Sequence, residues 1–171
     1  MKHLILINGT MGAGKTAVSN ELSLILKDNV LLEGDWAWKM NPFVVNDETK
    51  EMVMDNICFL LNSYIKCSIY ENIIFCWVMH EQWIIDRILS HLNLRDVNMY
   101  LFTLMPDKEA LIKWIQKDIN QGARKPDIIK RSLEYLEKYD KIESIKIDVS
   151  KHTPKQTAKI IAKQIYQIHE V

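Results

Sequence analysis

The sequence lacks an excess of charge of either sign and has no long hydrophobic run. Its 22 lysine and arginine residues equal its 22 aspartate and glutamate residues, so it has no overall basic field of the kind that drives nonspecific binding to nucleic acid. The apolar runs are far shorter than a membrane span, and the amino terminus runs into the first of them without the cationic region of a signal peptide. These absences predict a cytoplasmic protein without a membrane partner, and they weaken the case for a nucleic-acid partner without excluding a local basic groove.

Cysteine is scarce as well. Cys58, Cys67 and Cys76 are odd in number and lack C-x-x-C spacing, so we interpret them as reduced core residues of a cytosolic protein. The length of 171 residues suits one domain, residues 1–171, with a single large core. The oligomeric state cannot be predicted from these features.

Three of the five glycines lie in one stretch, Gly9-Thr10-Met11-Gly12-Ala13-Gly14-Lys15-Thr16. This stretch has the spacing G-x-x-x-x-G-K-[ST], follows the apolar run 4–7 and precedes a helical pattern at 17–26. The glycines allow consecutive N–H groups to form an anion-binding nest at the positive end of a helix. Lys15 is expected to reach the β- and γ-phosphates, and the Thr16 hydroxyl is expected to ligate Mg²⁺. All eight residues are therefore predicted to bind a nucleoside triphosphate.

Apolar runs alternate with segments of helical periodicity along the rest of the chain. Strands are predicted at 4–7, 30–32, 73–78, 97–104 and 145–149. Helices are predicted at 17–26, from Asn46 or Asp47, at 83–92, 107–120 and 127–141, and from Pro154 to Ile168. Thr153 and Gln156 form a predicted capping box for the last helix. Continuous apolar strands that alternate with helices predict an α/β fold with a parallel sheet covered on both faces.

Several classes of nucleotide-binding protein can be tested against the chain. A GTPase needs D-x-x-G and N-K-x-D elements, and neither occurs. A motor or AAA-type ATPase needs a hydrophobic strand that ends in an acid, but the third predicted strand ends in Phe75-Cys76-Trp77-Val78. Two acids, Glu33 and Asp35, directly follow a short early strand. An acid in this place faces the γ-phosphate across the cleft, where an acceptor hydroxyl would lie.

At this point the chain resembles the small P-loop kinases of the nucleotide, shikimate and gluconate kinase type. Within them it is most similar to the bacterial small-molecule kinases related to chloramphenicol phosphotransferase and the tunicamycin-resistance proteins. The residues that carry the resemblance are 9–16, Glu33-Gly34-Asp35, Lys113 and Lys117 with Arg124 and Arg131, and Ile147-Asp148-Val149-Ser150. The resemblance implies a three-layer α/β/α P-loop NTPase fold with a five-stranded parallel sheet, for which we predict the strand order 2-3-1-4-5.

The resemblance also implies that Asp35 is the catalytic base. Phosphoryl transfer needs one carboxylate that orients an alcohol and accepts its proton. Glu33, on the same side of an extended segment, is a candidate ligand of a magnesium-bound water. The alternative for Asp35 is an aspartate that caps a short turn.

A mobile lid is expected at about residues 113–131. Lys113 and Lys117 share a helix face suited to reaching phosphates, but the kinases that the chain resembles have arginines there. Lysine lacks the bidentate fork of arginine, so the clamping role is assigned to Arg124 or Arg131, with Arg124 preferred because it lies in a polar break beside Gly122. The alternative is a solvated helix face and a basic turn.

Two further groups of residues border the expected cleft. As in similar kinases, the turn at Asp148 is predicted to line the adenine pocket. Aromatic and apolar residues follow Asp35 and either form an acceptor pocket or cover the edge of the core; they are Trp36, Trp38, Met40 and Phe43. His80 is expected to be a hydrogen-bonding loop residue rather than a catalytic group.

These features together predict a kinase that depends on ATP and Mg²⁺. Its acceptor would be a hydroxyl or phosphate of a small molecule such as a nucleotide, nucleoside, sugar or antibiotic-like compound. Two alternatives remain open. One is a polynucleotide-kinase-like enzyme that acts on nucleic-acid ends, and the other is a non-catalytic binding module whose bound nucleotide switches a partner surface.

Overall fold

The computed structural model describes residues 1–167; Ile168, the last apolar residue predicted for the C-terminal helix, lies outside the described residues. Five strands pair in parallel in the order β2-β3-β1-β4-β5, which confirms the predicted order. The strands are β1 (Lys2–Asn8), β2 (Asn29–Glu33), β3 (Asn72–Cys76), β4 (Val97–Met105) and β5 (Ile145–Asp148). The three central strands, β3, β1 and β4, each contain a short continuous apolar run because both of their faces are covered.

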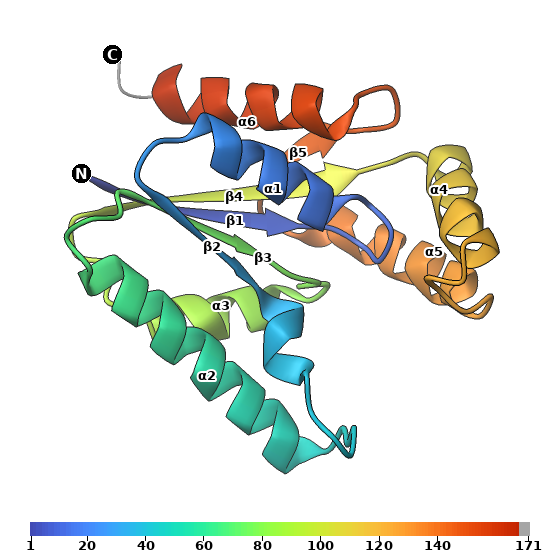
Figure 1. Cartoon of the computed structure of the whole chain (residues 1–171), viewed down its shortest axis with the longest axis horizontal. Coiled ribbons are helices and arrows are strands. Elements are labelled where there is room, and N and C mark those ends of the chain that lie inside the picture. The colour runs from blue at the N-terminus through green and yellow to red at the C-terminus, as the bar shows by residue number, and fades with distance from the viewer. Residues whose placement is uncertain (168–171) are drawn as a thin grey trace.

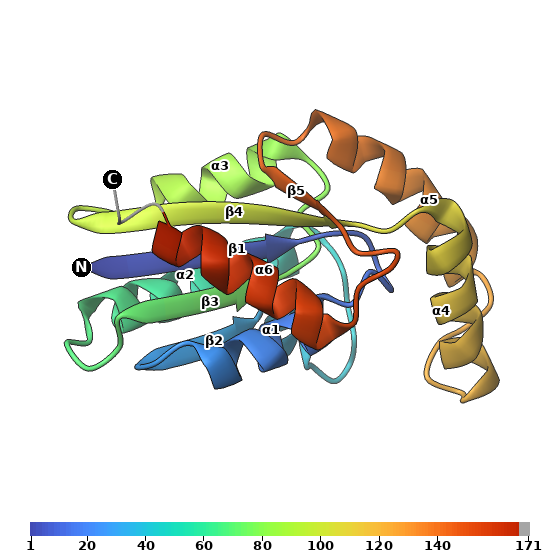
Figure 2. The same cartoon turned by 90° about the horizontal axis from the view of Figure 1, so that it is seen from above.

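Helices cover both faces of this sheet and one of its ends. They are α1 (Lys15–Ile25), α2 (Asp47–Lys66), α3 (Gln82–Ser90), α4 (Lys108–Asn120), α5 (Ile128–Lys138) and α6 (Pro154–Gln167), with short 3₁₀ helices η1 (Gly34–Trp38) and η2 (Tyr139–Lys141). Figure 1 shows α1 and α6 on one face of the sheet and α2 and α3 on the other. In both views α4 and α5 lie beyond the carboxyl ends of the strands, to which the arrowheads point (Figures 1 and 2).

The core is divided by the sheet into two apolar clusters. In β1, Leu4 and Leu6 face the cluster under α2 and α3, whereas Ile5 and Ile7 face the cluster under α1 and α6. All four side chains are fully buried. The period of two residues thus sends alternate side chains to opposite faces, as a sheet between two helical layers requires. A third, smaller cluster joins α4 to α5.

Helices α2 and α6 are capped at their N-termini by side chains. The Asn46 side chain accepts a hydrogen bond from the Thr49 N–H at 2.9 Å, and the Thr49 hydroxyl accepts one from the Asn46 N–H. The predicted capping box of α6 is confirmed, because Thr153 N–H donates to Gln156 Oε1 at 2.8 Å and Gln156 N–H donates to Thr153 Oγ1 at 3.2 Å.

Some predicted boundaries were wrong. β3 ends at Cys76, so Trp77 and Val78 belong to the loop that follows. The predicted helix at 127–141 is α5 followed by the separate 3₁₀ turn η2. The segment after β2, for which no helix was predicted, begins with η1. Within residues 1–167, no helix is both long and apolar enough to cross a membrane.

Candidate active site

The loop at residues 9–16 connects β1 to α1. Gly12 and Gly14 have φ values of +84° and +89°, a region in which a side chain would be strained. Gly14 is the N-cap of α1, and no side chain among the described residues caps this helix. The first N–H groups of α1 therefore keep their capacity to bind an anion.

The Lys15 side chain bonds back to the loop that precedes it. Its Nζ donates a hydrogen bond to the Thr10 carbonyl oxygen at 2.8 Å. Burial lowers the pKa of the Lys15 ammonium group to about 8, although the negative charge of Asp35 acts in the opposite direction. A phosphate placed beside Lys15 would favour the charged form further.

Thr16 and Glu33 meet at the start of α1. The Thr16 hydroxyl donates to Glu33 Oε2 at 3.2 Å, so the last loop residue and the last residue of β2 bring two oxygen ligands together. In the described part of the chain, no group of three or more His, Cys, Asp and Glu residues is arranged to hold a metal. Kinase sites typically bind Mg²⁺ through one or two protein oxygens, water and the phosphates, and the pair Thr16 and Glu33 fits that requirement.

Asp35 is placed by close packing of the turn that carries it. Gly34 is buried, and a Cβ at this position would lie 2.3 Å from Trp77 Cγ. Only glycine allows η1 to pack this closely on Trp77. The Asp35 carboxylate then lies near enough to Lys15 to act on its pKa.

One cavity of about 970 Å³ is lined by Lys15, Thr16 and Asp35, whereas Glu33 is not among its lining residues. It lies at the carboxyl ends of the strands, where α/β proteins bind ligands. Its lining comprises loop residues 11–16, Ala17, Val18, Asn20, Asp35, Val78, Trp114, Lys117, Asp118, Gln121, Arg124, residues 149–154 and Thr157. The cavity brings the predicted phosphate loop, the predicted base and the preferred lid arginine together.

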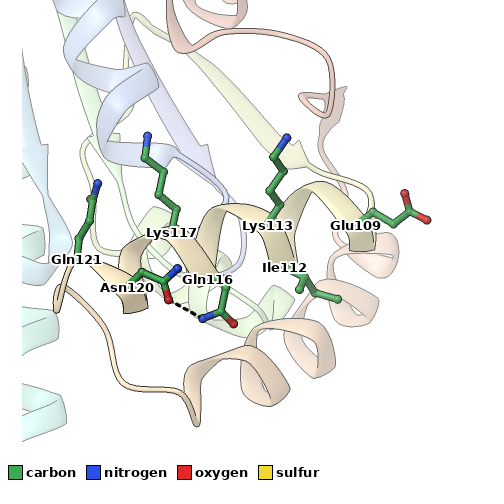
Figure 3. Close-up of a pocket in the computed structure, with 7 residues that line it drawn as sticks. All are labelled: Glu109, Ile112, Lys113, Gln116, Lys117, Asn120 and Gln121. Carbon is green, nitrogen blue, oxygen red and sulfur yellow. Dashed lines mark hydrogen bonds between the residues drawn. The ribbon is translucent and has the colours of Figure 1, made fainter.

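The lid residues come from α4 and the break after it. Arg124 lines the cavity, and its Nε donates to Asp118 Oδ2 at 2.9 Å. Lys113 and Lys117 project side by side from one face of α4 (Figure 3). Lys117 lines both the cavity and a shallow groove along α4, whereas Lys113 lines only the groove. Arg131 is exposed and is not among the lining residues.

Other predicted binding residues take part indirectly. Gly9 and Thr10, the first two residues of the loop, do not line the cavity. Asp148 does not line it either: the pKa of its carboxyl group is lowered by hydrogen bonds from the Ser150 hydroxyl at 2.6 Å and the Ser150 N–H at 2.9 Å. Asp148 thus shapes the turn, and the neighbouring residues Val149 and Ser150 line the cavity.

The aromatic residues after Asp35 divide into two groups. Trp38 and Met40 pack against the core, whereas Trp36 and Phe43 are 67% and 68% exposed. None of these four residues lines the cavity. His80 differs from the expected hydrogen-bonding residue, because its ring stacks on Tyr135 at 4.0 Å and its buried Nδ1 has no hydrogen-bond partner among residues 1–167.

Sequence reasoning missed several lining residues. Trp114 of α4 and Thr157 of α6 face the cavity from helices that are far apart in the sequence. Trp114 also packs against the core cluster under α1 and α6, so in the sequence it is indistinguishable from an ordinary core residue. Only the fold, which brings α4 and α6 to the same cavity, identifies these two residues.

The strand order and the loop beside this cavity define a P-loop α/β fold. A family model described as an AAA domain matches residues 5–137, and the chain therefore belongs to that family. An AAA-type ATPase mechanism needs an acid at the end of a hydrophobic strand. The residues that follow β3, Trp77-Val78-Met79, include no acid. A search of curated proteins found no match.

Solved structures show the same fold at low sequence identity. The Deinococcus radiodurans tunicamycin resistance protein is 21% identical with a TM-score of 0.73, and the match covers 96% of each chain. Shikimate kinase from Acinetobacter baumannii, solved with shikimate, is 16% identical with a TM-score of 0.68 over 99% of this chain and 96% of that one. A gluconokinase from Sinorhizobium meliloti 1021 is 15% identical with a TM-score of 0.66 over 98% and 97%. The expected P-loop α/β fold is confirmed, and kinases are among the solved structures that share it.

Proposed function

We propose that this protein is an ATP- and Mg²⁺-dependent phosphotransferase that moves the γ-phosphoryl group to a hydroxyl or phosphate of a small molecule. Nucleotides, nucleosides, sugars and antibiotic-like compounds are the candidate acceptors. One observation carries the proposal: Lys15, Asp35 and Arg124, from three separate segments of the chain, line a single cavity. Structural similarity to kinases gives independent support.

Each of these residues has a distinct task in the proposed transfer. Residues 11–16, Lys15 among them, hold the β- and γ-phosphates. Asp35 accepts the proton of the acceptor hydroxyl while the hydroxyl oxygen bonds to the γ-phosphorus. The bond from that phosphorus to the β–γ bridging oxygen breaks, and ADP leaves. Thr16 and Glu33 would hold Mg²⁺, which offsets charge on the β- and γ-phosphates.

We further propose that the lid spans about residues 113–131 within the single domain 1–171. Arg124 is the clamp for the transferring group, since its guanidinium can bind phosphate oxygens bidentately. Asp118 orients this side chain through their 2.9 Å hydrogen bond. Lid closure excludes water, which would otherwise compete with the acceptor. Lys117 binds the nucleotide directly. Asp148 contributes by holding the turn to Ser150 in the shape that lines the nucleotide site.

We propose a cytoplasmic location on the basis of the thiols. Cys58, Cys67 and Cys76 are free, and Cys58 and Cys76 are buried. Burial raises the pKa of the Cys76 thiol to about 11 and also raises that of Cys58, so both are unreactive core residues. Such residues suit a reducing compartment.

The test is incubation with γ-labelled ATP and Mg²⁺ against a panel of nucleosides, nucleotides, sugars, aminoglycosides and nucleoside antibiotics. With the acceptor found, Asp35→Asn should slow transfer by about 10²–10⁴-fold with ATP affinity retained, because it removes only the proton acceptor. Asp55→Asn, an exposed aspartate of α2 outside the cavity, is the matched control.

The other outcomes separate the alternatives. Undiminished transfer by Asp35→Asn would remove the base assignment. Tight ATP binding with negligible turnover over the whole panel would favour the nucleotide-responsive binding module. Transfer to a nucleic-acid end with a strongly salt-dependent KM would favour the polynucleotide-kinase-like enzyme.

A further inference from the structure

Gly9, the first residue of the phosphate loop, is held by side chains on both sides. Its N–H donates to Asn8 Oδ1 at 2.9 Å, and its carbonyl oxygen accepts a hydrogen bond from the Tyr139 hydroxyl at 2.9 Å. Asn8 and Tyr139 are both fully buried. The two bonds therefore fix the peptide groups on either side of Gly9 in an environment where water cannot replace a lost partner.

A second bond joins the same two parts of the chain. The Thr10 hydroxyl donates to the Ser132 carbonyl oxygen of α5 at 2.7 Å, and both residues are fully buried. Helix α5 and the turn η2 thus contact two consecutive residues of the loop. A hydroxyl on the loop bonds to the helix, and a hydroxyl on η2 bonds to the loop.

Tyr139 is suited to donate this bond at any pH of biological interest. Burial raises the pKa of its hydroxyl far above the ordinary value, and Tyr135 adds to the effect. The group is therefore a permanent neutral donor. Its partner, the Gly9 carbonyl, belongs to a loop whose positive-φ glycines make alternative conformations accessible. A hydrogen bond to this carbonyl therefore restricts the loop to fewer conformations.

The anchoring segment is itself fixed on its other side. Tyr135 stacks on His80, and Lys138 Nζ pairs with Glu81 Oε1 at 2.5 Å. The loop that carries His80 and Glu81 returns to β1, because the Asn8 side chain bonds both the N–H and the carbonyl of Met79. Helix α5 therefore lies between two loops that are already tied to each other.

We propose that Tyr139 is a positioning residue for the phosphate-binding loop, acting with the Thr10 hydroxyl to hold residues 9 and 10 in the conformation that binds nucleotide. This inference rests on nucleotide binding at residues 9–16, as proposed above. When a binding-competent conformation is populated only in part, the apparent Kd rises by the inverse of that fraction. Loss of the anchor is therefore measured as weaker binding by protein that is still folded.

The experiment is calorimetric titration of the full chain with the non-hydrolysable ATP analogue AMP-PNP and Mg²⁺, well below the melting temperature. Tyr139→Phe, which removes only the hydroxyl, should raise the Kd about tenfold, and Thr10→Val should have a similar effect. Thr10→Ser keeps the hydroxyl and should restore affinity close to that of the wild type. Tyr166→Phe, on the half-exposed tyrosine of α6, is the matched control.

Thermal melting of the same proteins separates positioning from simple stabilisation. A purely structural role would lower the Tm of Tyr139→Phe and Thr10→Val but leave the Kd of the folded proteins unchanged, and that result would overturn the inference. An equal loss of affinity in Tyr166→Phe would also overturn it. If Tyr139→Phe does not fold, the comparison of Thr10→Val with Thr10→Ser decides. A wild-type protein that binds no AMP-PNP would instead overturn the proposed function along with this inference.

Discussion

The ammonium group of Lys15 shows how strongly the fold controls a single residue. Burial lowers its pKa to about 8, so above that pH the side chain loses its charge when no phosphate is bound. A bound polyphosphate favours the charged form. We therefore expect nucleotide binding to be coupled to uptake of a proton once the pH exceeds about 8.

This coupling predicts the pH dependence of nucleotide binding. The Kd for Mg·ATP should be nearly constant from about pH 7 to 8 and should then rise by up to about tenfold per pH unit, because the protein must first recover a proton. Isothermal titration calorimetry in buffers of different ionisation enthalpy measures both the Kd and the proton uptake.

Lys15→Arg is the control for this prediction. Arginine stays charged over the whole range, so its Kd, even if weaker overall, should not rise above pH 8. A wild-type Kd that stays flat to pH 9.5 would contradict the lowered pKa.

At the residue scale, the sequence predicted the groups whose positions follow from short spacing. Lys15 and Thr16 are placed by the loop motif, and Asp35 by its distance from the end of β2. Asp148 was assigned to the nucleotide only through resemblance, and the structure shows its carboxylate bonded to Ser150. A family pattern locates a turn but does not say which of its side chains point into a cavity.

The 3₁₀ turn η1 controls the site at the scale of elements. Its first residue, Gly34, is packed against Trp77, and its second residue is Asp35. The position of the proposed base therefore depends on a contact between the segments after β2 and β3. We therefore expect the stability of the turn to affect the rate of the proposed transfer.

Gly34→Ala tests this dependence. The added methyl group would lie 2.3 Å from Trp77 Cγ, so the turn must shift, at an expected cost of about 1–3 kcal/mol in the free energy of unfolding. Urea denaturation measures the loss, and transfer should slow because Asp35 moves with the turn. Gly122→Ala is a steric control, since a methyl group there meets nothing within 4 Å and costs only the strain of its positive φ. Equal stability of wild type and Gly34→Ala would show that the contact is not tight.

The helices and strands themselves were largely predictable, since the helices show an apolar period and the strands are continuous apolar runs. The turn η1 was not predicted, because a 3₁₀ helix of five residues has too few positions to show a period. Trp77 and Val78 were assigned to β3 because they continue its apolar run, although the strand ends at Cys76. Hydrophobicity alone does not mark the point at which strand pairing stops.

At the scale of the whole molecule, ligand binding should be measurable as stability. Mg·ATP at 100 times its Kd should add about 2.7 kcal/mol to the free energy of unfolding, which corresponds to a rise in Tm of roughly 5–10 °C for a chain of this size. Differential scanning fluorimetry with and without EDTA measures the rise and its dependence on Mg²⁺. Lys15→Ala should show little or no rise, and a similar rise in that variant would place the nucleotide elsewhere.

The overall architecture could be predicted because the order of strands and helices leaves few parallel topologies. The contacts that complete the site could not. The hydroxyl of Tyr139 and the carbonyl of Gly9 are 130 residues apart in the sequence, and no local pattern connects them. The same holds for Trp114 and Thr157, which share the cavity only because α4 and α6 converge on it.

The most direct test is a crystal structure of the protein with AMP-PNP and Mg²⁺. The account predicts the triphosphate within residues 11–16, the metal beside Thr16 and Glu33, and the Asp35 carboxylate facing the γ-phosphorus from the acceptor side. A nucleotide bound outside this loop, or an Asp35 carboxylate directed away from the γ-phosphorus, would contradict it.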